Sequence, residues 1–162
     1  MNERWIVDAS PLIALGAVGR ANLLLELTGE LLVPGAVAEE VSQGPPEDSA
    51  RRLLERGFGT SATPAHVSGR LLAWGLGRGE TEVLALASEI SDARVVLDDA
   101  AARRCARTFG IPMIGTLGVV VRAKQLGRIE SAAVVFRSLR DRDFRVDDGV
   151  MKAVLEKVGE SW

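Results

Sequence analysis

Short apolar segments that alternate with longer amphipathic ones constrain the fold of this chain more than any other feature. Trp5–Val7, Leu31–Val33 and Val95–Leu97 are uniformly apolar runs, which are typical of short strands buried on both faces. Neighbouring parallel strands need long crossover connections, and helices usually supply them. The alternation therefore predicts an α/β fold, a three-layer sandwich in which helices cover both faces of a central parallel sheet.

The expected elements follow from apolar periodicity and from the residues that begin or end each segment. Ser10 is expected to cap the first helix, with Pro11 in its first turn. Strands are expected at 4–7, 31–33, 94–97 and 112–114, with one edge strand within 58–67. Later helices are expected at 21–27, 34–42, 47–56, 80–90, 100–109, 117–125, 129–139 and 147–158.

The length and composition predict a single domain over residues 1–162. Hydrophobic residues make up 47% of the chain and charged residues 26%, which suits a compact core. No apolar run approaches the roughly 18 residues that a membrane span needs, and the first residues lack the pattern of a signal peptide. Cys105 is the only cysteine and His66 the only histidine, so neither a disulfide nor a Cys-rich zinc site is expected. We therefore expect a cytoplasmic protein.

Acidic residues follow two of the predicted strands. Asp8 comes directly after the first strand, and Asp98 and Asp99 follow the strand that ends at Leu97. The carboxyl ends of parallel strands form one rim of the sheet, where ligands bind. Acids gathered there repel one another unless a cation neutralises them. Oxygen ligands alone favour a hard divalent ion, Mg²⁺ or Mn²⁺.

Two helical positions add further candidate acids. In the helix at 80–90, Glu80 lies at the edge of the apolar face, whereas Glu82 is expected in solvent. In the helix at 34–42, Glu40 is closer to the apolar face than Glu39. Glu80 and Glu40 are therefore the better site candidates of the two pairs.

Each acid also has a purely structural interpretation. Glu80 could complement the dipole of its helix, since acids are favoured in a first turn. One of Asp98 and Asp99 is expected to cap the next helix while the other faces the crevice. Asp8 could cap the first helix, although Ser10 is better placed for that role. The four acids together favour a site over four separate structural roles.

The net charge of −2 does not by itself indicate a nucleic-acid partner, but basic residues are concentrated in one region. Residues 103 to 145 include ten basic residues and only three acidic ones. Such a region beside an acidic pocket could bind a phosphate backbone while a metal assists its cleavage. Solvated helix faces are the alternative interpretation.

At these acids the chain resembles PIN-domain proteins, metal-dependent ribonucleases that include the toxins of toxin–antitoxin pairs. The similarity runs from Ile6 to about Gly159 and is closest to a bacterial and archaeal PIN-like subgroup related to those toxins. Five motifs carry it: Ile6-Val-Asp-Ala-Ser-Pro-Leu-Ile-Ala-Leu15, Val33-Pro-Gly-Ala-Val-Ala-Glu-Glu-Val41, Gly79-Glu-Thr-Glu-Val-Leu-Ala-Leu-Ala87, Val96-Leu-Asp-Asp-Ala-Ala-Ala-Arg103 and Gly115-Thr-Leu-Gly118.

The resemblance implies a negatively charged pocket that holds one or two Mg²⁺ or Mn²⁺ ions. Its four acids would be Asp8, Glu40, Glu80 and Asp98, with Asp99 as the alternate fourth acid. Glu80 stands where toxin members commonly have Asp, and Leu97-Asp98-Asp99 replaces the usual Thr/Ser-x-Asp of the fourth strand.

The expected roles follow from the chemistry of phosphodiester hydrolysis. Asp8 and Asp98 would bind the metal directly, Glu80 directly or through water, and Glu40 would orient or deprotonate the attacking water. Ser10 and Thr116 could hydrogen-bond to carboxylates or to a phosphate, although helix-cap and turn roles are as well supported. Arg103 could contact a phosphate or form an ion pair with Asp99 one turn before it.

We therefore predict a metal-dependent ribonuclease that acts on RNA. It could be the toxin of a toxin–antitoxin pair, with a small antitoxin protein as its partner. The resemblance also implies a homodimer. The alternative is a catalytically silent module that keeps the acidic metal pocket and binds RNA or an antitoxin without cleavage. A phosphatase or response-regulator relationship is disfavoured, because Asp8-Ala-Ser10 lacks the second acid of an Asp-x-Asp pair.

Overall fold

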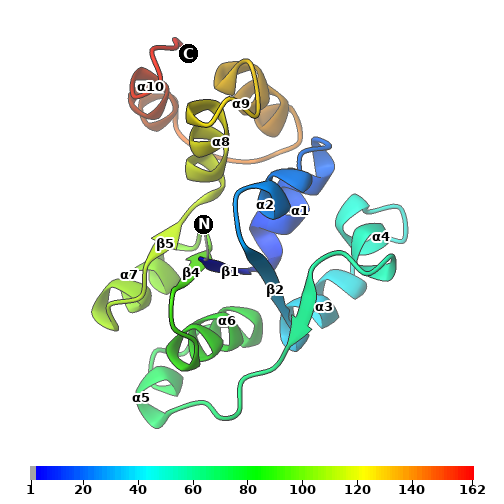
Figure 1. The fold of residues 1–162 in the computed structure, drawn as a ribbon, viewed down its shortest axis with the longest axis vertical. Coiled ribbons are helices and arrows are strands. Elements are labelled where there is room, and N and C mark those ends of the chain that lie inside the picture. The colour runs from blue at the N-terminus through cyan, green and yellow to red at the C-terminus, as the bar shows by residue number, and fades with distance from the viewer. Residues whose placement is uncertain (1–2) are drawn as a thin grey trace.

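The computed structural model describes residues 3–162 and contains one five-stranded parallel sheet. The strands lie in the order β3-β2-β1-β4-β5 (Figure 1). Every neighbouring pair is parallel, which confirms the predicted α/β class. The strand bounds are β1 (Arg4–Val7), β2 (Glu30–Pro34), β3 (Thr60–Ala62), β4 (Ala93–Val96) and β5 (Met113–Ile114).

Helices connect these strands and follow the last of them. They are α1 (Ala9–Ala17), α2 (Asn22–Glu26), α3 (Gly35–Ser42), α4 (Ser49–Glu55), α5 (Gly69–Leu72), α6 (Arg78–Glu89), α7 (Ala100–Thr108), α8 (Thr116–Gln125), α9 (Ala132–Asp141) and α10 (Asp148–Glu156). Within the described residues, no helix is long and apolar enough to cross a membrane.

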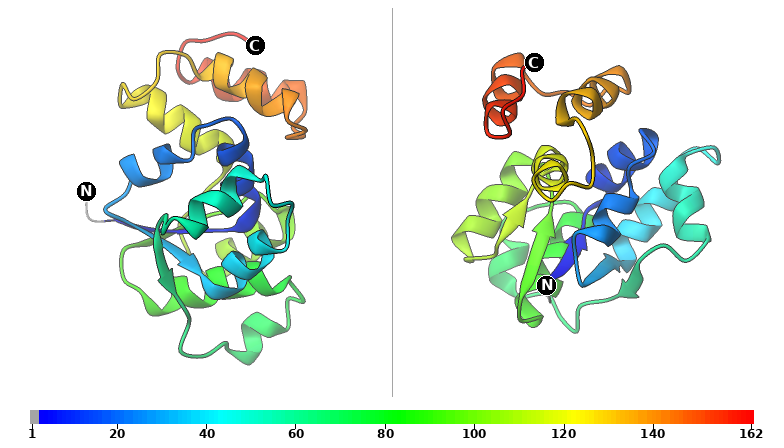
Figure 2. Two further views of the ribbon diagram at one scale, coloured as in Figure 1. Left: turned by 90° about the vertical axis from the view of Figure 1, so that its right-hand side faces the viewer. Right: turned by 45° about the horizontal axis from the view of Figure 1, so that its top comes forward.

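The helices form layers on the two faces of the sheet. On one face α6 packs against β1, β2 and β4, with α3 and α5 beside it. On the other face lie α1, α2 and α8, and α9 and α10 stack on α8 farther from the sheet (Figure 2). The fold is therefore the expected sandwich with an additional C-terminal pair of helices above one layer.

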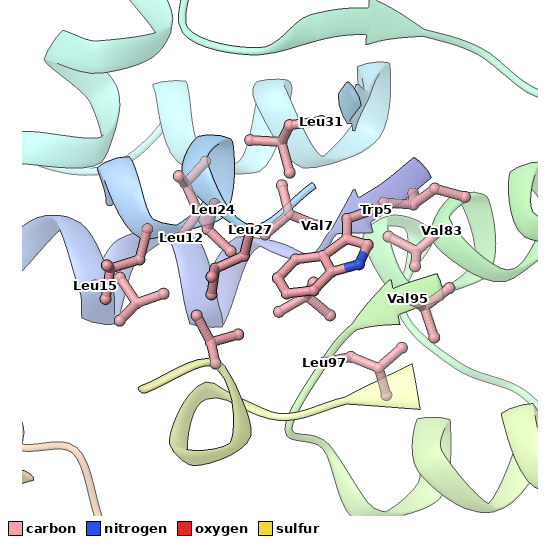
Figure 3. Close-up of a cluster of buried hydrophobic side chains, with 14 of the residues drawn as sticks. Trp5, Val7, Leu12, Leu15, Leu24, Leu27, Leu31, Val83, Val95 and Leu97 are labelled. Atoms are coloured by element: carbon pink, nitrogen blue, oxygen red, sulfur yellow. The ribbon is translucent and has the colours of Figure 1, made fainter. Parts of the chain in front are cut away.

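The core forms around Trp5 on the central strand. Trp5 is fully buried and belongs to one cluster of buried side chains with leucines of α1 and α2 (Figure 3). Its indole N–H donates to Glu3 Oε1 at 2.8 Å, and that carboxylate also pairs with Arg94 at 3.0 Å. The large aromatic ring on the middle strand is thereby buried while its one polar atom stays satisfied.

Three local details differ from the sequence-based expectations. Helix α1 starts at Ala9 with Asp8 as its N-cap residue, so Ser10 is inside the first turn and is not the cap. Helix α9 starts at Ala132, three residues later than expected, because the Ser131 hydroxyl accepts the Val134 N–H as an N-cap. The short helix α5, which Ser68 caps in the same way, was not predicted.

The order of the strands in the sheet reverses direction at β1. Strands β2 and β3 lie to one side of β1, and β4 and β5 lie to the other. Such a switch point leaves a crevice at the carboxyl ends of the two strands that flank it, here β1 and β4. Asp8 follows β1 directly, and Asp98 lies two residues after the end of β4.

Candidate functional site

Asp8 is the most buried acid of the candidate site, with 5% of its surface exposed. Its backbone N–H donates to the Val96 carbonyl at 3.0 Å, which fixes the residue at the junction of β1 and β4. Burial is the largest cause that raises the pKa of Asp8, and the negative charges of Glu80, Glu40 and Asp98 add to it. Against a hydrogen bond from the Ala9 N–H, these causes together bring the pKa to about 7. The carboxyl group therefore titrates near neutral pH.

Glu80 is half-buried in the first turn of α6. Its Oε2 accepts the Gly77 N–H at 3.2 Å, so the side chain helps to cap its own helix. Burial raises the pKa of Glu80, as do the charges of Asp99 and Glu40, while the Gly77 hydrogen bond opposes them. The structural role considered for Glu80 is thus present, together with close electrostatic coupling to the other acids.

Glu40 is exposed on α3 but borders Asp8. A Cβ atom added to Gly79 would lie 3.2 Å from Glu40 Oε1 and 3.4 Å from Asp8 Oδ1. The absence of a side chain at Gly79 therefore lets the start of α6 approach both carboxylates. Glu39 points elsewhere and forms an exposed ion pair with Arg78 at 3.2 Å.

Asp98 and Asp99 have different partners. Asp98 accepts two hydrogen bonds from Thr116, one from its backbone N–H at 2.8 Å and one from its hydroxyl at 2.6 Å. Thr116 is fully buried, so this contact holds the Asp98 carboxylate against the start of α8. Asp99 caps α7 by accepting the Ala102 N–H at 2.9 Å. One acid therefore caps α7 and the other joins β4 to α8.

Gly115 makes room for the contact between Asp98 and α8. A Cβ atom at Gly115 would lie 2.9 Å from Asp98 Oδ1 and 3.1 Å from Arg103 Nη1. Arg103 donates from Nη1 to the Leu97 carbonyl at 3.0 Å, and the ion pairs within residues 3–162 do not include the one expected between Arg103 and Asp99. The guanidinium is thereby held beside the strand end.

A cavity of about 960 Å³ joins most of these residues. This volume is near the upper end of the range of roughly 300–1,000 Å³ found for ligand pockets. Of the residues predicted from the sequence, the cavity is lined by Asp8, Ser10, Glu80, Asp98, Asp99 and Arg103. Glu40 and Thr116 are outside the lining, the first beside Asp8 and the second behind Asp98.

Part of the cavity lining comes from the end of the chain, which the sequence did not link to the site. We call it the C-terminal wall: residues 143–146 together with Val150, Val154 and Lys157. Its side chains are mainly apolar and basic, and they line the same cavity as the acids of the strand ends. No local motif predicts this wall, because it depends on how α10 packs against α8.

Glu82 was expected in solvent, and that expectation is wrong. Glu82 is half-buried, and its Oε1 accepts the Ala36 N–H at 2.9 Å in the first turn of α3. The helical face on which Glu82 lies was inferred correctly as polar, but α3 covers it. Glu82 caps a helix that lies 46 positions away, so the residues around Glu82 give no pattern that would predict this contact.

Only part of the basic region at residues 103–145 lines the cavity. Arg103 and Arg145 line it, whereas Lys124 pairs with Glu160 at 3.7 Å. Arg140 pairs with Asp148 and lies 4.7 Å from the centre of the Trp162 ring. Several of the basic side chains therefore hold the C-terminal segment in place and do not form one phosphate-binding face.

The donor set fits a hard divalent cation by its chemistry. The acids of the cavity offer only carboxylate oxygens. Burial and then repulsion from the neighbouring acids raise the pKa of Asp8, and a bound cation would relieve that repulsion. Within residues 3–162, no three acidic, histidine or cysteine side chains are grouped closely enough to enclose one ion. Mg²⁺ does not require such a cage, because it commonly uses one or two carboxylates and keeps several waters.

Comparison with known proteins agrees with this geometry. The model of the DUF3368 family, which is described as a PIN domain, matches residues 4–160. The match includes all five strands and the C-terminal helices. A search of curated proteins finds no match.

Proposed function

The chain belongs to the PIN-domain family, and we propose that it is a metal-dependent ribonuclease whose site is the acidic cavity. PIN domains are generally nucleases and typically use divalent metals. The observation that carries the proposal is Asp8, a buried carboxyl group at a ligand-sized cavity whose pKa neighbouring acids help to raise to about 7. A buried acid in a cleft that is strongly perturbed by named partners is a functional-site candidate.

Asp8 and Asp98 would hold Mg²⁺ or Mn²⁺ directly, and Glu80 would contact the ion through water, so that the ion keeps several waters. When bound, the ion supplies Lewis-acid stabilisation of the phosphate oxygens and a lowered pKa for bound water. Asp98 is already oriented by two hydrogen bonds from Thr116, so its position does not depend on the ion alone. Asp99 is the weaker candidate for a ligand, because it caps α7.

The remaining side chains have roles that their positions support. Glu40 borders Asp8 at an exposed position, where it can accept a proton from the attacking water and release it to solvent. Arg103 is held by the Leu97 carbonyl and lines the cavity, so it can orient a phosphate group. Ser10 lines the cavity from an exposed position in α1 and can donate a hydrogen bond to the same group.

Cleavage of a labelled RNA pool tests this proposal. The wild-type protein should cleave RNA in Mn²⁺ or Mg²⁺ and stop in EDTA, whereas Asp8→Asn should lose at least about 100-fold in rate, the usual scale for one catalytic group. Asp141→Asn, at an exposed position outside the cavity, is the matched control and should cleave like wild type. Equal cleavage by wild type and Asp8→Asn overturns the proposal.

A silent binding module remains the second candidate, and a specific observation favours it. No three of the acids enclose one point, and Glu80 and Asp98 already accept hydrogen bonds from within the protein. This candidate predicts that RNA binds the cavity with affinity that depends on Asp8, without any metal-dependent product. The same cleavage assay with a parallel binding measurement separates the two.

The finer assignments of partner and assembly stay proposals. We infer a cytoplasmic protein that could act as a toxin, with a small antitoxin as partner and a homodimer as its assembly. Exposed apolar side chains such as Leu25, Leu126 and Val134, at 43%, 47% and 55% exposure, give a dimer some apolar surface to bury. Sedimentation analysis tests the dimer, and a monomer at micromolar concentration contradicts it.

A further inference from the structure

The C-terminal wall differs in chemistry from the acidic side of the cavity. Phe144, Val150 and Val154 give it apolar surface, and Arg145 and Lys157 give it positive charge. Its one acid in the lining is Asp143. A ligand that fills the cavity would therefore meet carboxylates at the strand ends and, in the wall, two cations and an aromatic ring.

The wall is held in place by the last residues of the chain, Glu160 and Trp162, which we call the C-terminal clip. The Glu160 carboxylate accepts hydrogen bonds from the Ala132 and Ala133 N–H groups at 2.9 and 3.0 Å, at the start of α9. The Trp162 indole N–H donates to Asp148 at 2.8 Å, at the start of α10. Asp148 also pairs with Arg140 of α9, so both ends of α10 are tied to α9 (Figure 2).

The two cations of the wall have no partner within the described part of the chain. Among residues 3–162, neither the Arg145 nor the Lys157 side chain forms an ion pair or a hydrogen bond. Lys124 and Arg140, by contrast, are both paired with carboxylates. Since both wall residues are exposed and line the cavity, their charges are available to an anionic ligand.

We propose that the C-terminal wall is the subsite for an unpaired nucleotide that flanks the phosphate held at the acids, an inference that rests on the proposed function. Arg145 and Lys157 bind backbone phosphates of the strand. Phe144 contacts the base, because an aromatic face accepts any unstacked base, and Val150 and Val154 extend that apolar surface. The wall then binds the strand next to the phosphate that the acids would hold through a divalent ion.

The experiment measures equilibrium binding without cleavage. Fluorescence anisotropy of a labelled ten-nucleotide single-stranded RNA is followed with the Asp8→Asn protein in EDTA, alone or combined with Arg145→Ala, Lys157→Ala or both. The matched control is Lys152→Ala, which removes an exposed lysine of α10 that does not line the cavity. Thermal unfolding of each variant verifies that the fold is kept.

Each wall substitution should weaken binding about fivefold, as loss of one exposed charge contact does. The double substitution should also flatten the dependence of log K on log salt by about 1.4, at roughly 0.7 for each phosphate contact. Lys152→Ala should change the affinity less than twofold. Phe144→Leu should weaken binding of RNA at high salt, where stacking persists and charge contacts are screened.

Affinities of the wall variants equal to that of Lys152→Ala overturn the subsite. Tighter binding of a labelled ten-residue polyglutamate than of the RNA, with loss in the same wall variants, also overturns it, because the occupant is then an acidic peptide. Failure of the proposed function is separate: cleavage unaffected by Asp8→Asn contradicts the nuclease site without altering these affinities. In the cleaving protein, Arg145→Ala and Lys157→Ala should raise KM and leave kcat unchanged.

Discussion

At the scale of single residues, the candidate site depends on how Asp8 is buried. A carboxylate between β1 and β4 with 5% exposure loses hydration, and three nearby acids add repulsion. Glycines at 79 and 115 leave room for the acids: an added Cβ would be tight against Glu40 and Asp8 at position 79 and too close to Asp98 at position 115. The site is thus less stable than an apolar one of the same shape, as expected where function opposes stability.

Asp8→Asn should stabilise the metal-free protein. The pKa of Asp8 is about 7 in the folded protein against an ordinary value of 3.8. The neutral carboxyl group therefore contributes its full stability to the fold below pH 3.8, and this contribution is lost as the pH rises through 7. Asn stays neutral, so its free energy of unfolding should exceed that of wild type by roughly 2–4 kcal/mol at pH 8 and by little at pH 4. Urea unfolding in EDTA at both pH values measures this. A wild-type protein as stable as the variant at pH 8 contradicts the account.

Gly115→Ala should disturb the Asp98 contact specifically. The new Cβ would lie 2.9 Å from Asp98 Oδ1, an atom that Thr116 holds, so the carboxylate must move. We expect a loss of about 1–3 kcal/mol in stability, the usual cost of overpacking, and a loss of cleavage activity. Gly69→Ala is the control, because a Cβ there meets nothing within 4 Å. Equal stability and activity of the two variants would mean that Gly115 does not position Asp98.

At the scale of elements, the C-terminal clip decides where α10 lies and hence where the cavity ends. Burial raises the pKa of Glu160, but hydrogen bonds from Ala132, Ala133 and Ser131 and the charge of Lys124 outweigh it and lower the pKa to about 2. This carboxylate caps α9 from the far end of the chain. Such a cap stabilises a helix through both its hydrogen bonds and its charge.

Glu160→Gln should therefore destabilise the protein by about 1–2 kcal/mol at pH 7. Because the folded pKa is lower than the ordinary value of 4.5, the stabilisation is present above 4.5 and is lost as pH falls toward 2. Urea unfolding at pH 7 and pH 3 should show the difference shrinking at the lower pH. Glu156→Gln, exposed on α10, is the control. A difference that does not change with pH would show that the Glu160 charge is not responsible.

At the scale of the whole molecule, the fold was largely predictable and the site only in part. The strand positions and the acids after β1 and β4 follow from local patterns, because a buried strand needs apolar residues and its end is fixed by the sheet. Glu82 and Glu160 each cap a helix that is distant in sequence, so no pattern in their own segments reveals them. The C-terminal wall depends on helix packing for the same reason.

Equilibrium Mn²⁺ binding tests the central claim most directly, because it reports on the acids without requiring turnover. The free Mn²⁺ signal in electron paramagnetic resonance is titrated with wild type, Asp8→Asn and the control Asp141→Asn. We predict that wild type and the control bind Mn²⁺ with the same affinity and that Asp8→Asn binds it at least about tenfold more weakly. A loss of about that size in metal affinity is typical when a residue that supports a metal ligand is replaced. Equal affinity of all three proteins would contradict the account, because Asp8 would then have no part in holding a cation.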